Sequence, residues 1–191
     1  MKILIFDDSL EHCDIARRFL KDHDLTIVNS YDEAAQYLTH REVSKSRVVR
    51  CNPREFDVVM TDLMVPASED GLSDEHKYLG GTQMPLGTII ALRAIACGIK
   101  RVAVVTDDNH HRNPASAAFD YFPPAVGDVK LMCVNDVWGY VDEQTFERVD
   151  RGYVDTEEGQ KKYPRDQNTW IPRGLKTVGK DWLAVLNSLT S

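Results

Sequence analysis

The sequence predicts an α/β fold, built as a doubly wound parallel sheet of five strands. Short apolar runs that read as buried strands alternate with segments whose apolar residues recur at helical spacing. Alternating strands and helices imply parallel strands with helices on both faces, because right-handed crossovers leave few other arrangements. A chain of 191 residues, 42% of them hydrophobic, is long enough to bury one core. We therefore expect a single domain over residues 1–191.

Two strand–helix units open the chain. Residues 2–6 form an apolar run that stops at two acids, and Ser9 is a helix cap for the amphipathic segment that follows. Residues 25–28 predict the second strand. Ser30 and Glu33 have the spacing of a capping box, which predicts that the second helix begins there.

The later strands follow the same pattern. The apolar run 58–61 is the third strand and ends abruptly at Asp62. A helix over 88–97 leads to a fourth strand over 102–105, and a fifth strand is predicted over 129–134. These runs complete the five strands of the expected sheet.

Three polar segments, 41–55, 67–85 and 137–172, read as insertions on the surface. The second is too polar and too broken for a regular element, and because it directly follows the third strand it could act as a lid. A short helix is predicted over 115–119. A closing helix is predicted after Pro172, with the apolar residues Val178, Trp182, Leu183, Val185, Leu186 and Leu189.

Composition excludes several classes of protein. The net charge of -7 and the pI near 5.3, without any basic stripe, argue against binding to nucleic acid. No apolar run reaches membrane-spanning length, and the first apolar run is too short for a signal peptide. The scattered cysteines suggest neither zinc nor a disulfide framework, so we expect a reduced, cytoplasmic chain. These cysteines are Cys13, Cys51, Cys97 and Cys133.

Polar side chains gather where the predicted strands end. In a parallel sheet every strand's carboxyl end lies at one edge, which is where ligands bind. That edge would collect Asp7, Asp8, Asp62, Thr106 and Asn135. Two carboxylates about 5 Å apart repel by on the order of 3 kcal/mol at an effective dielectric near 20, so the acids need a cation or a shared proton. Mg²⁺ prefers oxygen ligands of this kind and commonly binds phosphate as well.

These motifs resemble the response-regulator receiver domain, with the flavodoxin-like fold of the chemotaxis receivers. The matching residues are the pair Asp7 and Asp8 after the first strand, Asp62 after the third and Thr106 after the fourth. The resemblance implies that Asp62 accepts a phosphoryl group and that Asp8, Asp62 and the carbonyl of Met64 bind Mg²⁺. Asp7 would assist the metal through water, and Thr106 would follow the phosphoryl group.

The same resemblance implies partners rather than turnover of a substrate. A histidine kinase or phosphotransfer protein would donate the phosphoryl group in two-component signalling, and a downstream protein would receive the signal. The protein would then be a phosphoprotein and not an enzyme in its own right. Whether the chain forms a homodimer stays open.

Two departures from the family pattern affect the site. The family has a lysine at the end of its fifth strand, whereas this chain has Asn135, and Lys130 lies at the opposite end of that strand. The family's aromatic switch position is occupied by Met132. An insertion could supply a substitute cation or block the site.

Two other functions remain as alternatives. A pseudo-receiver would keep the fold, lack phosphorylation and act through protein contacts. A haloacid-dehalogenase-like phosphatase also uses an aspartate at a strand end, but it needs an acid two positions after that aspartate. Here Ser9 stands two positions after Asp7, which argues against the phosphatase.

Overall fold

The computed structural model describes residues 1–38, 41–42, 49–50, 56–68, 72–106, 117, 125–135, 138–165 and 171–191. Within these residues the predicted parallel sheet is present. Its parallel strands are β1 (Lys2–Phe6), β2 (Asp24–Val28), β5 (Val58–Asp62), β8 (Arg101–Thr106) and β10 (Val129–Asn135). They lie in the order β2-β1-β5-β8-β10, and the short β9 (Ala125–Val126) pairs antiparallel with β10 at the edge. This order is that of the flavodoxin-like fold, so the predicted fold class is confirmed.

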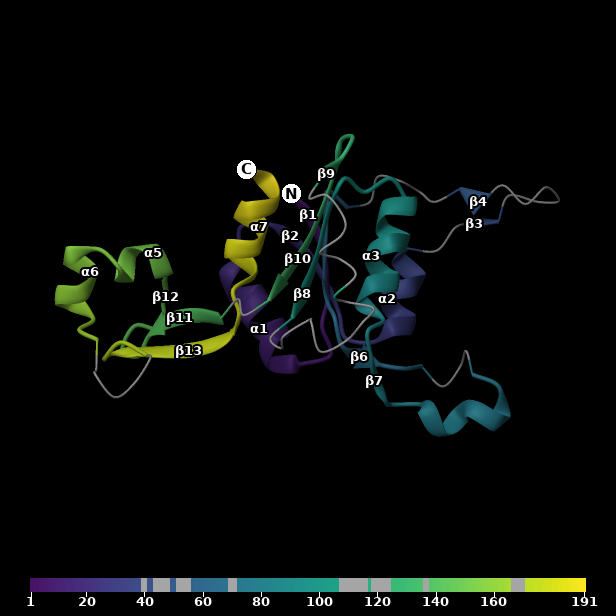
Figure 1. Ribbon diagram of the computed structural model, residues 1–191, viewed down its shortest axis with the longest axis horizontal. Helices are drawn as coiled ribbons and strands as arrows, with labels where there is room; N and C mark the ends of the chain where they lie inside the picture. The colour runs from purple at the N-terminus through teal and green to yellow at the C-terminus, as the bar shows by residue number, and fades with distance from the viewer. Residues whose placement is uncertain are drawn as a thin grey trace.

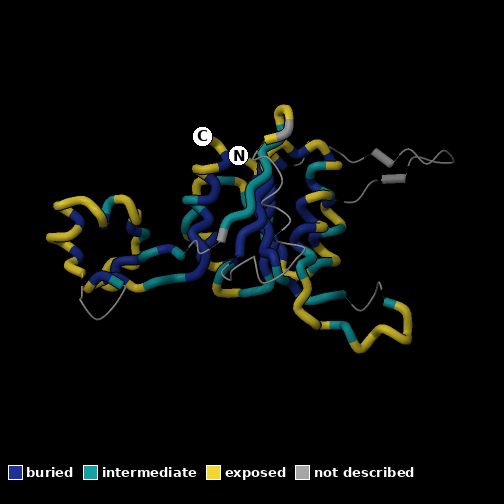
Figure 2. Tube along the Cα trace, in the orientation of Figure 1, coloured by how far each residue is buried: buried dark blue, intermediate teal, exposed yellow. Residues whose placement is uncertain are grey.

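Helices cover both faces of the sheet (Figure 1). Helices α1 (Leu10–Phe19) and α7 (Trp182–Thr190) cover one face, while α2 (Tyr31–Tyr37) and α3 (Gly87–Ala96) cover the other. Side chains of β1 alternate between two cores, because successive residues of a strand point to opposite faces. Ile3 and Ile5 pack with α1 and α7, whereas Leu4 and Phe6 pack with α2 and α3. Figure 2 shows the burial concentrated in this sheet.

The predicted helix signals are confirmed in the structure. The hydroxyl of Ser9 accepts a hydrogen bond from the backbone N–H of His12 at 3.4 Å. The hydroxyl of Ser30 accepts one from the N–H of Glu33 at 3.3 Å. Helix α3 ends before Gly98, whose φ of 82° is a conformation that glycine adopts without steric cost.

The first two insertions contain short regular elements. In the first, β3 (Arg41–Glu42) pairs antiparallel with β4 (Val49–Arg50), and the rest of 41–55 lies outside the described residues. The second holds β7 (Gln83–Met84), which pairs with β6 (Val65–Pro66), and a 3-10 helix, η1 (Asp74–Leu79). The prediction that 67–85 lacks regular elements is therefore wrong, because two-residue strands are too short to produce a periodic pattern.

The third insertion is a folded unit that projects from the sheet (Figure 1). It contains β11 (Trp138–Asp142), β12 (Arg148–Val149), α5 (Arg151–Val154), α6 (Glu157–Lys162) and β13 (Leu175–Lys180). The three strands form an antiparallel sheet in the order β12-β11-β13. Val149, Val154, Tyr163 and Leu175 form its own apolar cluster. We call the described residues from 138 to 180 the extension.

The closing helix begins later than the sequence predicted. Residues 175–180 form β13, which pairs with β11, so Val178 belongs to a strand. Helix α7 begins at Trp182, with the side chain of Asp181 accepting a hydrogen bond from the N–H of Ala184 at 3.1 Å. The apolar residues from 182 onward have helical spacing by themselves, so the pattern could not show where the strand ended.

Several predictions concern covalent and membrane features. Cys13 and Cys133 are free thiols, whereas Cys97 is disulfide-bonded, so the expectation of a fully reduced chain does not hold for Cys97. Among the helices that the structure describes, none is both long and apolar enough to cross a bilayer. The helix predicted over 115–119 lies, apart from Ala117, outside the described residues.

Candidate functional site

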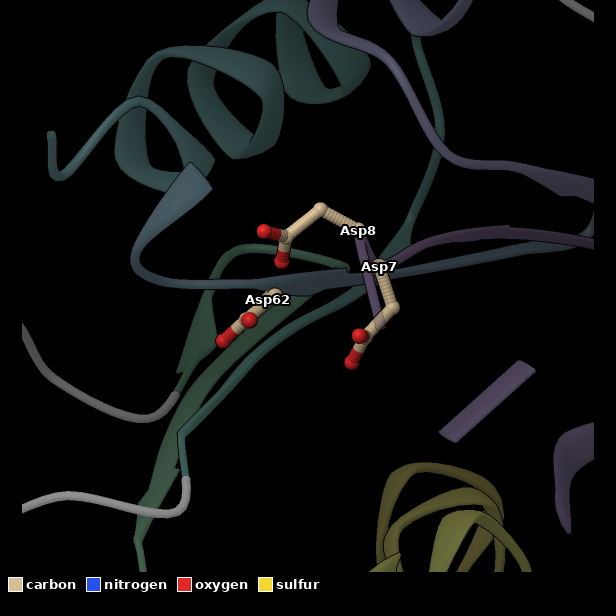
Figure 3. A group of neighbouring side chains, drawn as sticks. All are labelled: Asp7, Asp8 and Asp62. Atoms are coloured by element: carbon tan, nitrogen blue, oxygen red, sulfur yellow. The ribbon is translucent and has the colours of Figure 1, made fainter. Parts of the chain in front are cut away.

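Three carboxylates meet at the carboxyl edge of the sheet, as the sequence predicted. The parallel register sets Phe6 beside Thr61, so Asp7 follows one strand end and Asp62 completes the next. One carboxylate oxygen from each of Asp7, Asp8 and Asp62 lies within 4.8 Å of the others. Their side chains leave the two strand ends in different directions around this shared space (Figure 3). Asp7 is fully buried, and Asp62 is 7% exposed.

A lysine that the sequence did not predict lies between two of these acids. The Nζ atom of Lys180 is 2.7 Å from Oδ2 of Asp7 and 2.7 Å from Oδ1 of Asp62. Lys180 is the last residue of β13 and its side chain is 1% exposed. Burial alone would lower its pKa, but the charges of Asp62 and Asp7 raise that pKa above its usual value. Lys180 therefore stays protonated and supplies the cation that the acids need.

Both carboxylate oxygens of Asp7 are engaged by the protein. Oδ1 accepts a hydrogen bond from the N–H of Ser9 at 2.9 Å, and Oδ2 lies 3.2 Å from Nδ1 of His12 as well as bonding Lys180. Burial acts to raise the pKa of Asp7, but the hydrogen bond with His12 and the charge of Lys180 hold it below its usual value. Asp7 is thus a charged, fixed acid.

Asp62 is held differently and keeps one oxygen available. Its Oδ1 accepts a hydrogen bond from the N–H of Leu63 at 2.6 Å in addition to the ion pair with Lys180. No hydrogen-bond donor from the described part of the chain reaches its Oδ2. Burial raises the pKa of Asp62 to about 6, with Lys180 opposing the rise and Asp7 adding to it. Of Asp7 and Asp62, Asp62 is therefore the acid whose charge is more readily neutralised.

The backbone around Asp62 is fixed by the start of α3. The N–H of Gly87 donates to the carbonyl of Leu63 at 3.1 Å. A Cβ atom on Gly87 would overlap with the carbonyl oxygen of Asp62, so only glycine lets the helix approach this closely. The hydroxyl of Thr61 donates to the same carbonyl oxygen of Asp62 at 2.9 Å. These contacts hold the strand end rigid where Asp62 projects.

The second insertion also reaches the site. Gln83, in β7, donates from Nε2 to Oδ2 of Asp8 at 2.9 Å. Because β7 pairs with β6, which follows Asp62 by only a few residues, the hairpin folds back toward the acids. Gln83 thereby orients Asp8. This contact joins the segment that follows β5 to the acid cluster.

Thr106 and Asn135 lie at the carboxyl edge of the parallel sheet, whereas Lys130 does not. Thr106 ends β8 and is 1% exposed, one position beyond Val105, which pairs with Asp62. Asn135 ends β10 beside Thr106. Met64 is partly buried against the core on the α2 and α3 face. Lys130 is remote, as predicted, and donates from Nζ to the carbonyl of Ser188 at 2.8 Å.

Sequence reasoning missed Lys180 because nothing local marks it as a site residue. It follows Gly179 and precedes Asp181 in a segment that was assigned to the closing helix. The available signal was a pair of charged residues between Val178 and Trp182, both apolar. That pattern indicates a buried charge in need of a partner, but it does not identify which acid provides the partner.

The donor set fits a hard divalent cation. Three carboxylates gather within reach of one ion, and oxygen ligands are those that Mg²⁺ prefers. Asp8 and Asp62 each have described hydrogen-bond or ion-pair contacts at one carboxylate oxygen, whereas both oxygens of Asp7 are bonded. An acid cluster that could bind a metal is therefore present. The sequence matches no protein-family model and no curated protein.

Proposed function

We propose that this protein is a receiver-like signalling domain that accepts a phosphoryl group on Asp62, with Mg²⁺ held by the acidic cluster. The observation that carries the proposal is the ion pair of Lys180 with Asp7 and Asp62. It supplies the cation that Asn135 does not provide at the end of the fifth parallel strand. Asp7, Asp8 and one buried ammonium then surround the carboxylate of Asp62.

In the proposed reaction, Oδ2 of Asp62 attacks the phosphorus of a phosphohistidine. An O–P bond forms to give an acyl phosphate, and the P–N bond breaks with its electron pair staying on the imidazole, which takes a proton. Lys180 balances the charge on Oδ1 and is positioned to pair with phosphoryl oxygens. The hydroxyl of Thr106, at the neighbouring strand end, is the candidate donor to the same oxygens.

Asp8 and Asp62, with the carbonyl of Met64, would hold Mg²⁺, and Asp7 would assist through water. When bound, the ion would neutralise charge on the phosphoryl oxygens. Such a site is loaded by another protein and does not turn over a substrate. A histidine kinase or phosphotransfer protein is the proposed donor, and a downstream protein is the proposed recipient of the signal.

The test is labelling with acetyl phosphate and MgCl₂, followed by intact-protein mass spectrometry. We expect the wild type to gain one phosphoryl group that hydroxylamine removes, and Asp62→Asn to gain none. Asp57→Asn is a matched control, because Asp57 directly precedes β5, five positions before Asp62. Among the described contacts its side chain accepts a hydrogen bond only from the N–H of Lys2, at 2.8 Å. Equal labelling of the wild type and Asp62→Asn would refute the proposal.

A second candidate function is a pseudo-receiver that binds proteins without phosphorylation. The same ion pair favours it, since Lys180 neutralises part of the acid charge with no metal required. This candidate predicts that the melting temperature is independent of Mg²⁺. Stabilisation of the wild type by millimolar MgCl₂, lost in Asp62→Asn, would favour the phosphoryl acceptor instead.

A further inference from the structure

The cation of the acid site belongs to the extension. Lys180 is the last residue of β13, and among the described strands β13 pairs only with β11 of the extension. Lys180 nevertheless reaches across to Asp7 and Asp62, which lie at the edge of the parallel sheet. One side chain therefore joins the third insertion to the site.

The next residue is clamped by a second strand of the extension. Arg148, in β12, binds Asp181 through two nitrogens. Its Nε lies 3.0 Å from Oδ1 of Asp181, and its second guanidinium nitrogen lies 2.9 Å from Oδ2. The Asp181 side chain is 3% exposed, so the pair is held away from water, and a fork of this kind fixes geometry as well as charge.

The body of the protein holds the same junction from the other side. Gly179 packs so closely under the ring of His12 that a Cβ atom would overlap with it. Trp182, which is fully buried, donates from Nε1 to the carbonyl of His12 at 3.1 Å. The guanidinium of Arg148 also lies 5.9 Å from the ring centre of Phe19 in α1. The position of Lys180 therefore depends on how the extension docks against α1.

We propose that Arg148 is a positioning residue of the acid site, through which the docking of the extension controls where the ammonium of Lys180 lies. A cation that enters the cluster competes with Lys180 for Asp62. Occupancy of the site and docking of the extension are then linked, and linkage requires the effect to be reciprocal. The extension becomes the element that reports the state of Asp62, which rests on the proposed function of that site.

The test measures Mg²⁺ binding by calorimetry at pH 8, using full-length protein and no phosphodonor. Lys180→Met removes the competing charge, and we expect it to tighten Mg²⁺ binding by about fivefold or more. Arg148→Met should tighten binding in the same direction, because Lys180 is no longer held on Asp62. Arg165→Met is the matched control, since Arg165 pairs with Asp155 on the exposed surface of the extension. The Mg²⁺ affinity of this variant should equal that of the wild type.

The double variant separates positioning from a general charge effect. If Arg148 acts through Lys180, Arg148→Met adds nothing to Lys180→Met. If Arg148→Met acted only by removing a positive charge, its effect on Mg²⁺ affinity would add in full to that of Lys180→Met. Arg148→Lys keeps the charge and one ion pair, so it should fall between Arg148→Met and the wild type and also serves if Arg148→Met does not fold. Unchanged affinity in both Arg148 variants, additive effects, or no Mg²⁺ binding by any variant would overturn the inference.

Hydrogen exchange provides the reciprocal measurement. Addition of Mg²⁺ should speed exchange at the amides of residues 175–180 in the wild type and leave Lys180→Met unchanged. If the hydrogen-exchange protection of β13 in the wild type were the same with and without Mg²⁺, the inference would also be overturned. Labelling with acetyl phosphate tests the proposed phosphorylation separately. If no label appears but the Mg²⁺ affinities of the variants are non-additive, the proposed phosphorylation is refuted and the role of Arg148 stands.

Discussion

The neighbouring carboxylates of Asp7 and Asp62 have pKa values that are shifted in opposite directions. Asp7 is fully buried but has partners on both oxygens, and its pKa is held below its usual value despite burial. Asp62 shares the same lysine but has fewer partners, and burial raises its pKa to about 6. The difference follows from the hydrogen bonds that each carboxylate receives, which favour the charged form. Asp62 is thus the carboxylate of this pair that takes up a proton more readily.

This difference predicts how stability depends on pH. The pKa of Asp62 is about 6 in the folded protein against an ordinary value of 3.8, so the folded state holds the proton more tightly. The contribution of Asp62 to the free energy of unfolding is therefore greatest below pH 4 and is lost as pH rises through 6. The loss is on the order of 3 kcal/mol. Asp62→Asn, which carries no charge, should lack this loss.

The measurement is urea unfolding in EDTA at pH 4.5 and pH 7. The difference between wild type and Asp62→Asn should shift in favour of the variant at the higher pH. The pKa of Asp7 is held below its usual value in the folded protein, so Asp7 stays charged at both pH values. Asp57→Asn provides a control at an exposed carboxylate. A constant difference between wild type and Asp62→Asn across this range would contradict the raised pKa.

At the scale of elements, α3 matters because its first residue touches the site. Gly87 begins the helix and lies against the carbonyl of Asp62. The N–H of Gly87 bonds the carbonyl of Leu63 at 3.1 Å, so the helix and the end of β5 are joined directly. The helix then buries Ile90, Ala91 and Ala94 against the sheet. Displacing the start of α3 would therefore move the backbone that carries Asp62.

Gly87→Ala tests this close approach. The added methyl group overlaps with the carbonyl oxygen of Asp62, so α3 must shift, and overpacking of this kind costs about 1–3 kcal/mol. Urea unfolding measures the cost. Leu92→Ala, on the half-exposed side of the same helix, is the control and should change stability much less. If Gly87→Ala were as stable as the wild type, the end of β5 would be able to move away from the added methyl group without a cost in stability.

At the scale of the whole molecule, the chain contains apolar clusters that belong to different parts. The two large clusters lie on the faces of the parallel sheet. The third, smaller cluster belongs to the extension and includes Val154 and Tyr163. The hydroxyl of Tyr163 donates to Oδ2 of Asp142 at 2.6 Å, which adds a buried polar contact to that cluster. The extension thus has a core of its own beside the sheet.

A substitution in the small cluster should act locally. Val154 is 3% exposed in the extension, so Val154→Ala should cost about 2 kcal/mol and should raise hydrogen exchange mainly within residues 138–165 and 171–180. Ile90→Ala, in the core of the sheet, is the comparison and should lower protection throughout the parallel strands. Equal loss of protection in both regions from Val154→Ala would show that the extension and the sheet unfold as one unit.

The parallel sheet could be predicted because its signals are local. Apolar runs mark β1, β5 and β8, and the cap residues Ser9 and Ser30 mark where helices begin. Parallel strands share one carboxyl edge, so the strand ends predicted that Asp7, Asp8 and Asp62 gather there, and the structure brings them together. The extension was missed because its longer strands are not uniform apolar runs: β13 includes Lys176 and Lys180, and β11 ends in Asp142.

The sequence by itself determined the sheet and its three acids, because apolar periodicity and strand ends are properties of neighbouring residues. Only the tertiary structure decided which cation completes the site. Lys180 lies 173 residues from Asp7 in the chain, and its approach depends on β13 pairing with β11 and on the clamp between Arg148 and Asp181. Contacts between such distant residues arise from packing, which no local pattern in the sequence records.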